Sequence, residues 1–140
     1  MVSTRDGWAF LAVLLLFFAS VGCSQNVGLR GKVTFSDDGS PVPVGTIAFL
    51  KDGLIARGDI KPDGSYVVGF ERETNGLPPG DYQVFVTADD IVGKTQSDFN
   101  IIRSLIDRKY NNPDTSGMTL QVTSQTKTFD IVLDRNTKER

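Results

Sequence analysis

The chain of 140 residues contains no histidine and a single cysteine, Cys23. Without histidine the commonest general base and metal ligand is missing, which excludes catalytic arrangements built on a serine–histidine or cysteine–histidine pair. One cysteine cannot form an internal disulfide, and it does not supply the ligand set of a structural zinc site. The formal net charge is −2 with both signs spread along the chain, so no basic face suits a nucleic acid. We therefore expect no enzyme, no metal and no cofactor.

The first 22 residues have the pattern of a secretory signal. Arg5 provides positive charge near the start, and eleven apolar residues follow from Ala9 to Ala19. A helix of that length rises about 16 Å, against roughly 30 Å for the hydrocarbon core of a bilayer. The pattern therefore predicts a signal peptide over residues 1–22 that is removed, rather than a permanent spanning helix.

The end of this segment resembles a bacterial lipobox, in which a cysteine is acylated and becomes the first residue. The sequence is Ser20-Val21-Gly22-Cys23, with serine where such boxes usually have leucine. In Gram-negative lipoproteins an aspartate after the cysteine often signals retention in the inner membrane, and its replacement by Ser24 favours the outer membrane or cell surface. We predict lipidation at Cys23 and a tether over 23–28. The alternative is an ordinary cleavage site beside an incidental thiol.

Beyond the tether, apolar residues recur at every second position between turn signals, which predicts β-strands. The expected strands are residues 29–35, 46–50, 54–60, 65–70, 81–88, 118–122 and 127–133. The Asp38-Gly39, Asp52-Gly53 and Asp63-Gly64 pairs indicate turns rather than calcium loops. Each strand has one apolar face to bury, so we expect an all-β, Ig-like sandwich of about seven strands over residues 29–134, followed by a polar tail over 135–140.

Several of these segments resemble the carboxypeptidase regulatory-like domains, which are small transthyretin-like β-sandwiches. They are Gly31-Lys32-Val33-Thr34-Phe35, Gly45-Thr46-Ile47-Ala48-Phe49, Asp63-Gly64-Ser65-Tyr66 and Pro79-Gly80-Asp81-Tyr82-Gln83-Val84. The stretch from Lys109 to Met118 is similar to a segment of small planctomycete-type lipoproteins with that fold. The resemblance spans residues 29–134. It implies a non-catalytic accessory or binding module, and no catalytic residues come with it.

Residues 89–117 break the strand rhythm, and so long a connection has a function or a structure of its own. A helical face is compatible with the spacing of Phe99, Ile102, Ile106 and Tyr110, with Ser97 or Asp98 as its cap and residues 111–113 as its end. The family resemblance implies instead a mostly extended crossover with one helical turn near residues 104–110. We expect a short helical turn within residues 97–110.

Basic and aromatic residues gather in this insertion. Arg103, Arg108, Lys109 and Tyr110 form a candidate recognition surface for an acidic glycan or a partner protein. The alternative is a solvated loop with Tyr110 packed against the sandwich. The insertion as a whole shapes a recognition surface, covers an open sheet edge, or does both.

Together these patterns predict a lipid-anchored envelope protein whose sandwich binds an envelope protein or polysaccharide. A second hypothesis is a purely structural envelope lipoprotein. A third is a carboxylate-based hydrolase, which would need two carboxyl groups about 5–10 Å apart in a cleft. The sequence predicts neither the ligand nor the oligomeric state.

Overall fold

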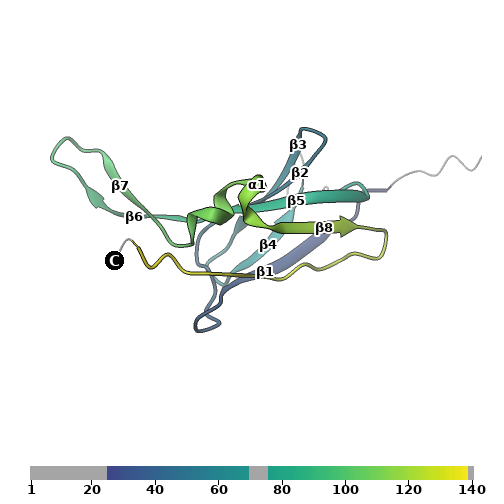
Figure 1. Cartoon of the computed structure of the whole chain (residues 1–140), viewed down its shortest axis with the longest axis horizontal. Coiled ribbons are helices and arrows are strands. Elements are labelled where there is room, and N and C mark those ends of the chain that lie inside the picture. Colours follow the sequence, from purple (N-terminus) through teal and green to yellow (C-terminus); the bar gives the residue numbers. More distant parts are fainter. Residues whose placement is uncertain (1–24, 70–75, 139–140) are drawn as a thin grey trace, which may run out of the picture.

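The structure is a computed structural model, and it describes residues 25–69 and 76–138. Two sheets pack face to face, as Figure 1 shows. The strands are β1 (Leu29–Phe35), β2 (Gly45–Lys51), β3 (Leu54–Ile60), β4 (Ser65–Val68), β5 (Gly80–Thr87), β6 (Asp89–Lys94), β7 (Asn100–Ser104), β8 (Met118–Val122) and β9 (Ile131–Leu133). The expected all-β sandwich is confirmed.

One sheet has the strand order β3-β2-β5-β8 and the other has the order β4-β1-β9. Every pair in them is antiparallel except β1 with β9, which runs parallel. These two sheets contain seven strands, the number that the alternating pattern predicts. The remaining two strands, β6 and β7, form a sheet of their own that extends from one end of the sandwich, coloured green in Figure 1. The predicted signal peptide and Cys23 lie outside the described residues.

The core lies between the inward faces of the two sheets. Phe49 of β2 is fully buried at its centre, and its ring lies 6.5 Å from that of Tyr66 and 6.4 Å from those of Tyr82 and Phe129. Burying one such side chain stabilises the fold by about 1.5–3 kcal/mol. The inward residues of β1 and β5 alternate with exposed or half-buried ones, as expected for half-buried strands.

The aspartate–glycine pairs form the expected turns. Between β2 and β3 both Asp52 (φ 50°) and Gly53 (φ 78°) have the positive φ that a tight hairpin requires. The Asp63 carboxylate accepts hydrogen bonds from the backbone N–H and hydroxyl of Ser65, at 3.0 and 2.6 Å. Asp38 accepts the same two bonds from Ser40. These carboxylates therefore hold the turns that the sequence predicts.

The last predicted strand, 127–133, is regular only over Ile131–Leu133. Residues 127–129 follow β1 through isolated bonds, from Arg30 N–H to the Lys127 carbonyl and from Phe129 N–H to the Arg30 carbonyl. The Tyr66 hydroxyl also donates to the Phe129 carbonyl. The bond from the Tyr66 hydroxyl and the isolated backbone bonds of Arg30 thus replace part of the regular hydrogen-bond ladder between β1 and residues 127–129.

The insertion folds differently from its predicted helical face. Phe99 and Ile102 belong to the β6–β7 hairpin, and Asp98 lies in its turn with φ 64°. The helical turn is η1 (Arg108–Asn111), which overlaps the end of the expected range. A second turn, α1 (Pro113–Ser116), begins where the helix was expected to end, because the Asn112 side chain accepts the Asp114 N–H and caps it. The predicted helix does not form here because the β-branched residues at 91–92 and 101–102 favour strands, and these strands pair across the turn between them.

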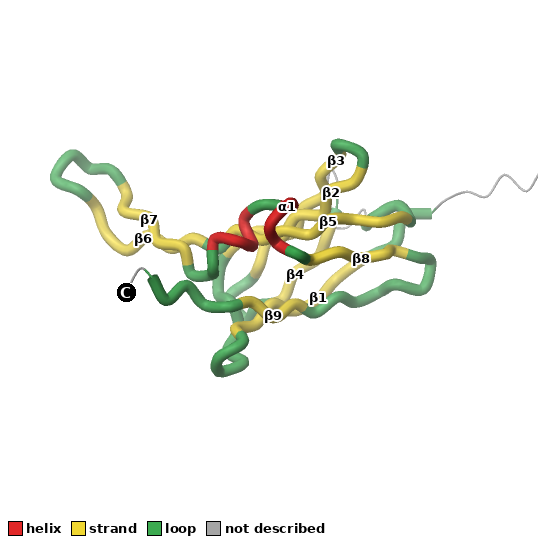
Figure 2. Tube along the Cα trace, viewed as in Figure 1, coloured by secondary structure: helices red, strands yellow, loops and turns green. Residues whose placement is uncertain are grey.

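The insertion has two parts with different roles. Residues 105–117 lie against β5 where β8 has not yet begun, and the Ser116 hydroxyl donates to the Val84 carbonyl at 2.5 Å. This part covers a sheet edge, as one hypothesis predicts. Residues 89–104, the β6–β7 hairpin, pair with neither edge of the sandwich and project from it, as Figure 2 shows.

Candidate recognition site

The β6–β7 hairpin exposes five large apolar side chains in a short segment. Their exposed fractions are 61% for Ile91, 46% for Val92, 72% for Phe99, 45% for Ile101 and 63% for Ile102. Single exposed apolar residues are ordinary, but a group on one element marks a surface that another molecule covers. An isolated two-stranded hairpin is also only marginally stable in water. We call these five side chains the hairpin apolar set.

The hairpin apolar set occupies both faces of the two-stranded sheet. Ile91 pairs with Ile102 on one face, whereas Ile101 pairs with Gly93 on the other. Val92 is the extra residue of a β-bulge, since two residues of β6 span the distance that one residue of β7 spans. Packing one face against the sandwich would therefore leave the other face exposed. The two adjacent β-branched pairs, 91–92 and 101–102, are the sequence signal that would have predicted these strands.

The tip of the hairpin is polar. Residues 95–98 are Thr-Gln-Ser-Asp, and Lys94 pairs with Asp98 at 3.3 Å across the turn. The hairpin carries no excess of positive charge, because Asp89, Asp90 and Asp98 outnumber Lys94 and Arg103. Segments that lie in a lipid surface combine an apolar face with lysine and arginine on the polar face. The geometry of the hairpin therefore suits a protein surface better than a membrane.

At the base of the hairpin, Asp134 connects three separate segments. Its carboxylate accepts hydrogen bonds from Lys109 Nζ at 2.6 Å, the Tyr110 hydroxyl at 2.9 Å and the Ser36 hydroxyl at 2.9 Å. These donors, with Lys109 first, lower the pKa of Asp134 to about 2. The hydrogen bond to Asp134, followed by the contact with Tyr110, raises the pKa of Lys109. Asp134 thereby ties η1 and the loop after β1 to the end of β9.

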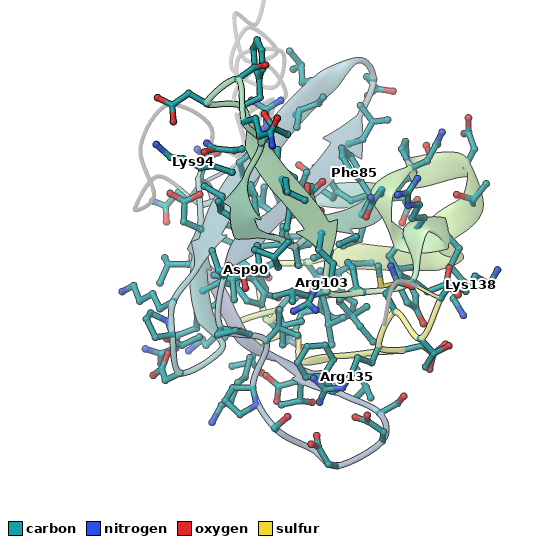
Figure 3. All side chains as sticks on the ribbon, turned by 90° about the vertical axis from the view of Figure 1, so that its left-hand side faces the viewer. Phe85, Asp90, Lys94, Arg103, Arg135 and Lys138 are labelled. Carbon is teal, nitrogen blue, oxygen red and sulfur yellow. The ribbon has the colours of Figure 1, made fainter. Side chains whose placement is uncertain are left out.

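Arg135, the next residue, fixes the loop between β1 and β2. Its guanidinium lies 3.6 Å from the centre of the Phe35 ring, and it pairs with Asp37 at 2.9 Å and Asp38 at 3.2 Å. It also donates to the Ser40 hydroxyl. Figure 3 views this end of the molecule, with Arg135 below the base of the hairpin. The predicted polar tail therefore begins with a residue that is part of the folded domain.

The predicted recognition residues do not form one surface. Lys109 and Tyr110 meet at Asp134, where Lys109 Nζ lies 4.7 Å from the centre of the Tyr110 ring. Tyr110 is buried against the sandwich, and Arg108 is exposed on η1. Arg103 lies on β7 opposite Asp90, and both are labelled in Figure 3. The donors of Lys109 and Tyr110 are thus used within the fold, and of the four residues only Arg103 shares an element with the hairpin apolar set.

A hollow of about 630 Å³ lies on the outer face of the four-stranded sheet, between the β2–β3 turn and β8. Two of the polar side chains around it are bound within the protein. Lys51 Nζ donates to the Pro79 carbonyl at 3.0 Å, and the Tyr82 hydroxyl donates to the Pro78 carbonyl at 2.8 Å. In the described part of the chain, no group of three or more acidic or cysteine side chains is placed to hold a metal ion.

No model of a known protein family matches the sequence, and no curated protein is significantly similar to it. Two crystal structures of BcpA, the major pilin subunit of Bacillus cereus, resemble the fold with a TM-score of 0.44 and 13% identity, over 80% of this chain and 30% of the pilin. A 9R-lipoxygenase from Cyanothece PCC8801 gives 0.38 and 14%, over 79% of this chain and 16% of the enzyme. The chain thus spans under a third of either protein, and likeness at this level carries no argument about function.

Among the described residues, no helix is long and apolar enough to cross a membrane. The resemblance to carboxypeptidase regulatory-like domains stays a prediction, because the comparisons identify no family. The general fold that this resemblance implies, a β-sandwich over residues 29–134, agrees with the structure.

Proposed function

We propose that this protein is a non-catalytic binding module of the bacterial envelope, held at a membrane by lipid on Cys23, and that it binds a protein partner through the β6–β7 hairpin. The hairpin apolar set is the observation that carries the proposal. Five large apolar side chains on a projecting two-stranded sheet have no cover within the described residues. A binding partner supplies that cover.

The placement of the hairpin supports this role. The described chain begins at residue 25 at one end of the molecule, and the hairpin projects from the opposite end, as Figure 1 shows. A protein attached to a membrane near residue 23 would hold its hairpin away from the surface, where another protein can reach it. The polysaccharide alternative has less support, since the hairpin offers aliphatic rather than polar contacts.

Position-specific photo-crosslinking in intact cells tests the binding role. A photoreactive residue replaces Ile102 in the full-length chain, and a matched chain carries it in place of Val132, which is similarly exposed (61%) but lies on β9. We expect a discrete adduct from position 102 and none from position 132. If neither position gives an adduct, or if both give the same diffuse products, the hairpin is not a binding surface.

The lipid anchor has its own test. Labelling of the full-length chain with radioactive palmitate should mark the wild type and not the Cys23→Ala variant. The variant should also leave the membrane fraction. Labelling that survives in Cys23→Ala would remove the anchor from the proposal without affecting the binding role of the hairpin.

A further inference from the structure

The two edges of the hairpin differ in how they are protected. On β6 the bulge at Val92 interrupts the regular spacing of backbone groups, which is one way in which proteins block edge-to-edge pairing. On β7, residues 100–104 contain no bulge and no proline. In the described residues no strand pairs with the outer edge of β7. The edge of β7 is therefore the side that can accept another strand.

The hydrogen bonds of the hairpin define which backbone groups of β7 point outward. Leu105 N–H donates inward to the Ala88 carbonyl, and Thr95 N–H donates to the Phe99 carbonyl. Backbone groups alternate in direction along a strand. The N–H and C=O of Ile102 and Asn100 therefore point away from β6. The Asn136 side chain bonds the Ser104 carbonyl at 3.2 Å, and this oxygen keeps a second lone pair for a strand at the edge.

From this edge we infer that the partner of the hairpin is a second copy of this chain, joined by antiparallel pairing of β7 with β7 about Ile102. The inference rests on the proposed binding role of the hairpin. Pairing about Ile102 creates a four-stranded sheet in the order β6-β7-β7-β6. One face of that sheet then has an unbroken row of four isoleucines, Ile91 and Ile102 from each copy.

Neighbouring registers fit less well. A slip by one residue is excluded, because it would turn the side chains of one copy to the other face of the sheet. A shift of the symmetry axis to Arg103 would place the two guanidinium groups directly opposite each other, which is destabilising. A shift to Ile101 would place Asn100 opposite Ile102 and break the aliphatic row. With the axis at Ile102, Arg103 lies between Asp90 of its own chain and Ile101 of the second copy, without opposed like charges.

The polar tip and the shape of the molecule favour a second copy over a membrane. In the joined sheet, the polar tip of each hairpin, from Lys94 to Asp98, lies beside the base of the other copy's hairpin. Because the strands are antiparallel, the two sandwiches lie at opposite ends of this sheet. The paired surface is the same on both chains, as a twofold dimer requires.

The test uses opposite charges at the symmetry axis. Full-length chains are purified from membranes in detergent, and their mass is measured by light scattering coupled to size exclusion. We expect a dimer for the wild type and for Val132→Lys, the control on β9. In Ile102→Lys and in Ile102→Glu, like charges oppose each other at the axis, and dimerisation should weaken about tenfold or more. Mixing these two variants should restore the dimer.

Two outcomes would overturn the inference, and both are distinct from failure of the binding role. One is a wild-type chain that is monomeric at the concentrations where an adduct forms at position 102. The other is an adduct whose mass is not that of two copies, in which case another protein covers the hairpin. Absence of any adduct at position 102 would instead contradict the proposed function itself. Circular dichroism of each variant checks that the sandwich is folded.

Discussion

The sandwich and the β6–β7 hairpin use the same kinds of residue with opposite results. In the sandwich, Phe49 is fully buried among three aromatic rings, whereas Phe99 of the hairpin is 72% exposed. Both segments are rich in isoleucine, valine and phenylalanine. Composition therefore does not separate the two regions. The arrangement along the chain does, because alternating apolar residues share one face and adjacent ones occupy two.

This difference separates stability from binding. A side chain that is already buried stabilises the fold, whereas one that stays exposed can contribute free energy only when a partner covers it. Substitutions in the sandwich should therefore change the free energy of unfolding, and substitutions in the hairpin should change association. Each of the following predictions compares a residue of the folded domain with a matched control.

The largest effect is expected from the pair of phenylalanines. Phe49→Ala should lower the free energy of unfolding by about 3–5 kcal/mol, because it removes buried area and leaves a cavity. Phe99→Ala should change it by no more than about 0.5 kcal/mol. Urea denaturation followed by circular dichroism measures both. If Phe99→Ala lowers the free energy of unfolding by more than about 1–2 kcal/mol, the hairpin belongs to the folding core.

The next largest change in the free energy of unfolding is expected for Gly31 in β1. A Cβ atom there would lie 1.9 Å from the Phe129 carbonyl oxygen, whereas one at Gly28 would meet nothing within 4 Å. Gly31→Ala should therefore cost about 1–3 kcal/mol or more, and Gly28→Ala should have little effect on stability. Denaturation curves of the two variants make the comparison. If both variants change the free energy of unfolding equally, the segment before Ile131 can move away from β1 without destabilising the fold.

Gly31 also shows how far the sequence determined the fold. The period-two pattern predicted the seven sandwich strands, and Asp52-Gly53 and Asp63-Gly64 predicted turns, because these features depend on residues close together in the chain. The contact of Gly31 with Phe129 joins segments that are far apart in sequence, and no local pattern encodes it. The irregular course of residues 127–129 was therefore missed.

The candidate site was predicted less well than the fold. Tyr110 and Lys109 were candidates for a recognition surface, and the alternative placed Tyr110 against the sandwich. The structure agrees with the alternative, since Tyr110 is buried and both side chains donate to Asp134, which is distant in the sequence. The hairpin was missed because Ile91-Val92 and Ile101-Ile102 do not alternate with polar residues. The bulge at Val92 accounts for the first of these pairs, and a search for alternating residues cannot recognise it.

Substitution of Arg135 should change the free energy of unfolding by a smaller amount, and Arg103 on β7 provides the comparison. Arg135→Ala removes the contact with the Phe35 ring and the pairs with Asp37 and Asp38, and it should cost about 1 kcal/mol. Arg103→Ala, on β7, should leave the free energy of unfolding nearly unchanged. Thermal unfolding measured at two salt concentrations tests both. If high salt removes the whole effect of Arg135→Ala, its ion pairs rather than its contact with the ring stabilise the loop.

The smallest effect concerns pH and is centred on Asp134, whose pKa is lowered to about 2 in the folded chain, first by Lys109 and then by Ser36 and Tyr110. A carboxylate with a depressed pKa stabilises the fold fully above the pKa of about 3.9 that it has when unfolded, and this stabilisation is lost as the pH falls toward about 2. In Asp134→Asn, the free energy of unfolding should therefore fall less steeply between about pH 4 and pH 2 than in the wild type. Asp38 and Asp63, whose pKa values are also lowered, retain part of the slope.

Lys109→Met provides the matched control for this pH effect, because it removes the first cause of the shift but keeps the carboxylate. It should flatten the same part of the curve, and the double variant should be no flatter than Asp134→Asn alone, since both substitutions disrupt one interaction. Acid denaturation at fixed urea concentrations gives the slopes. Parallel curves for the wild type and Asp134→Asn would mean that residues 108–110 are held by the burial of Tyr110 rather than by charge. The division between a buried domain and an exposed hairpin would then rest on apolar packing alone.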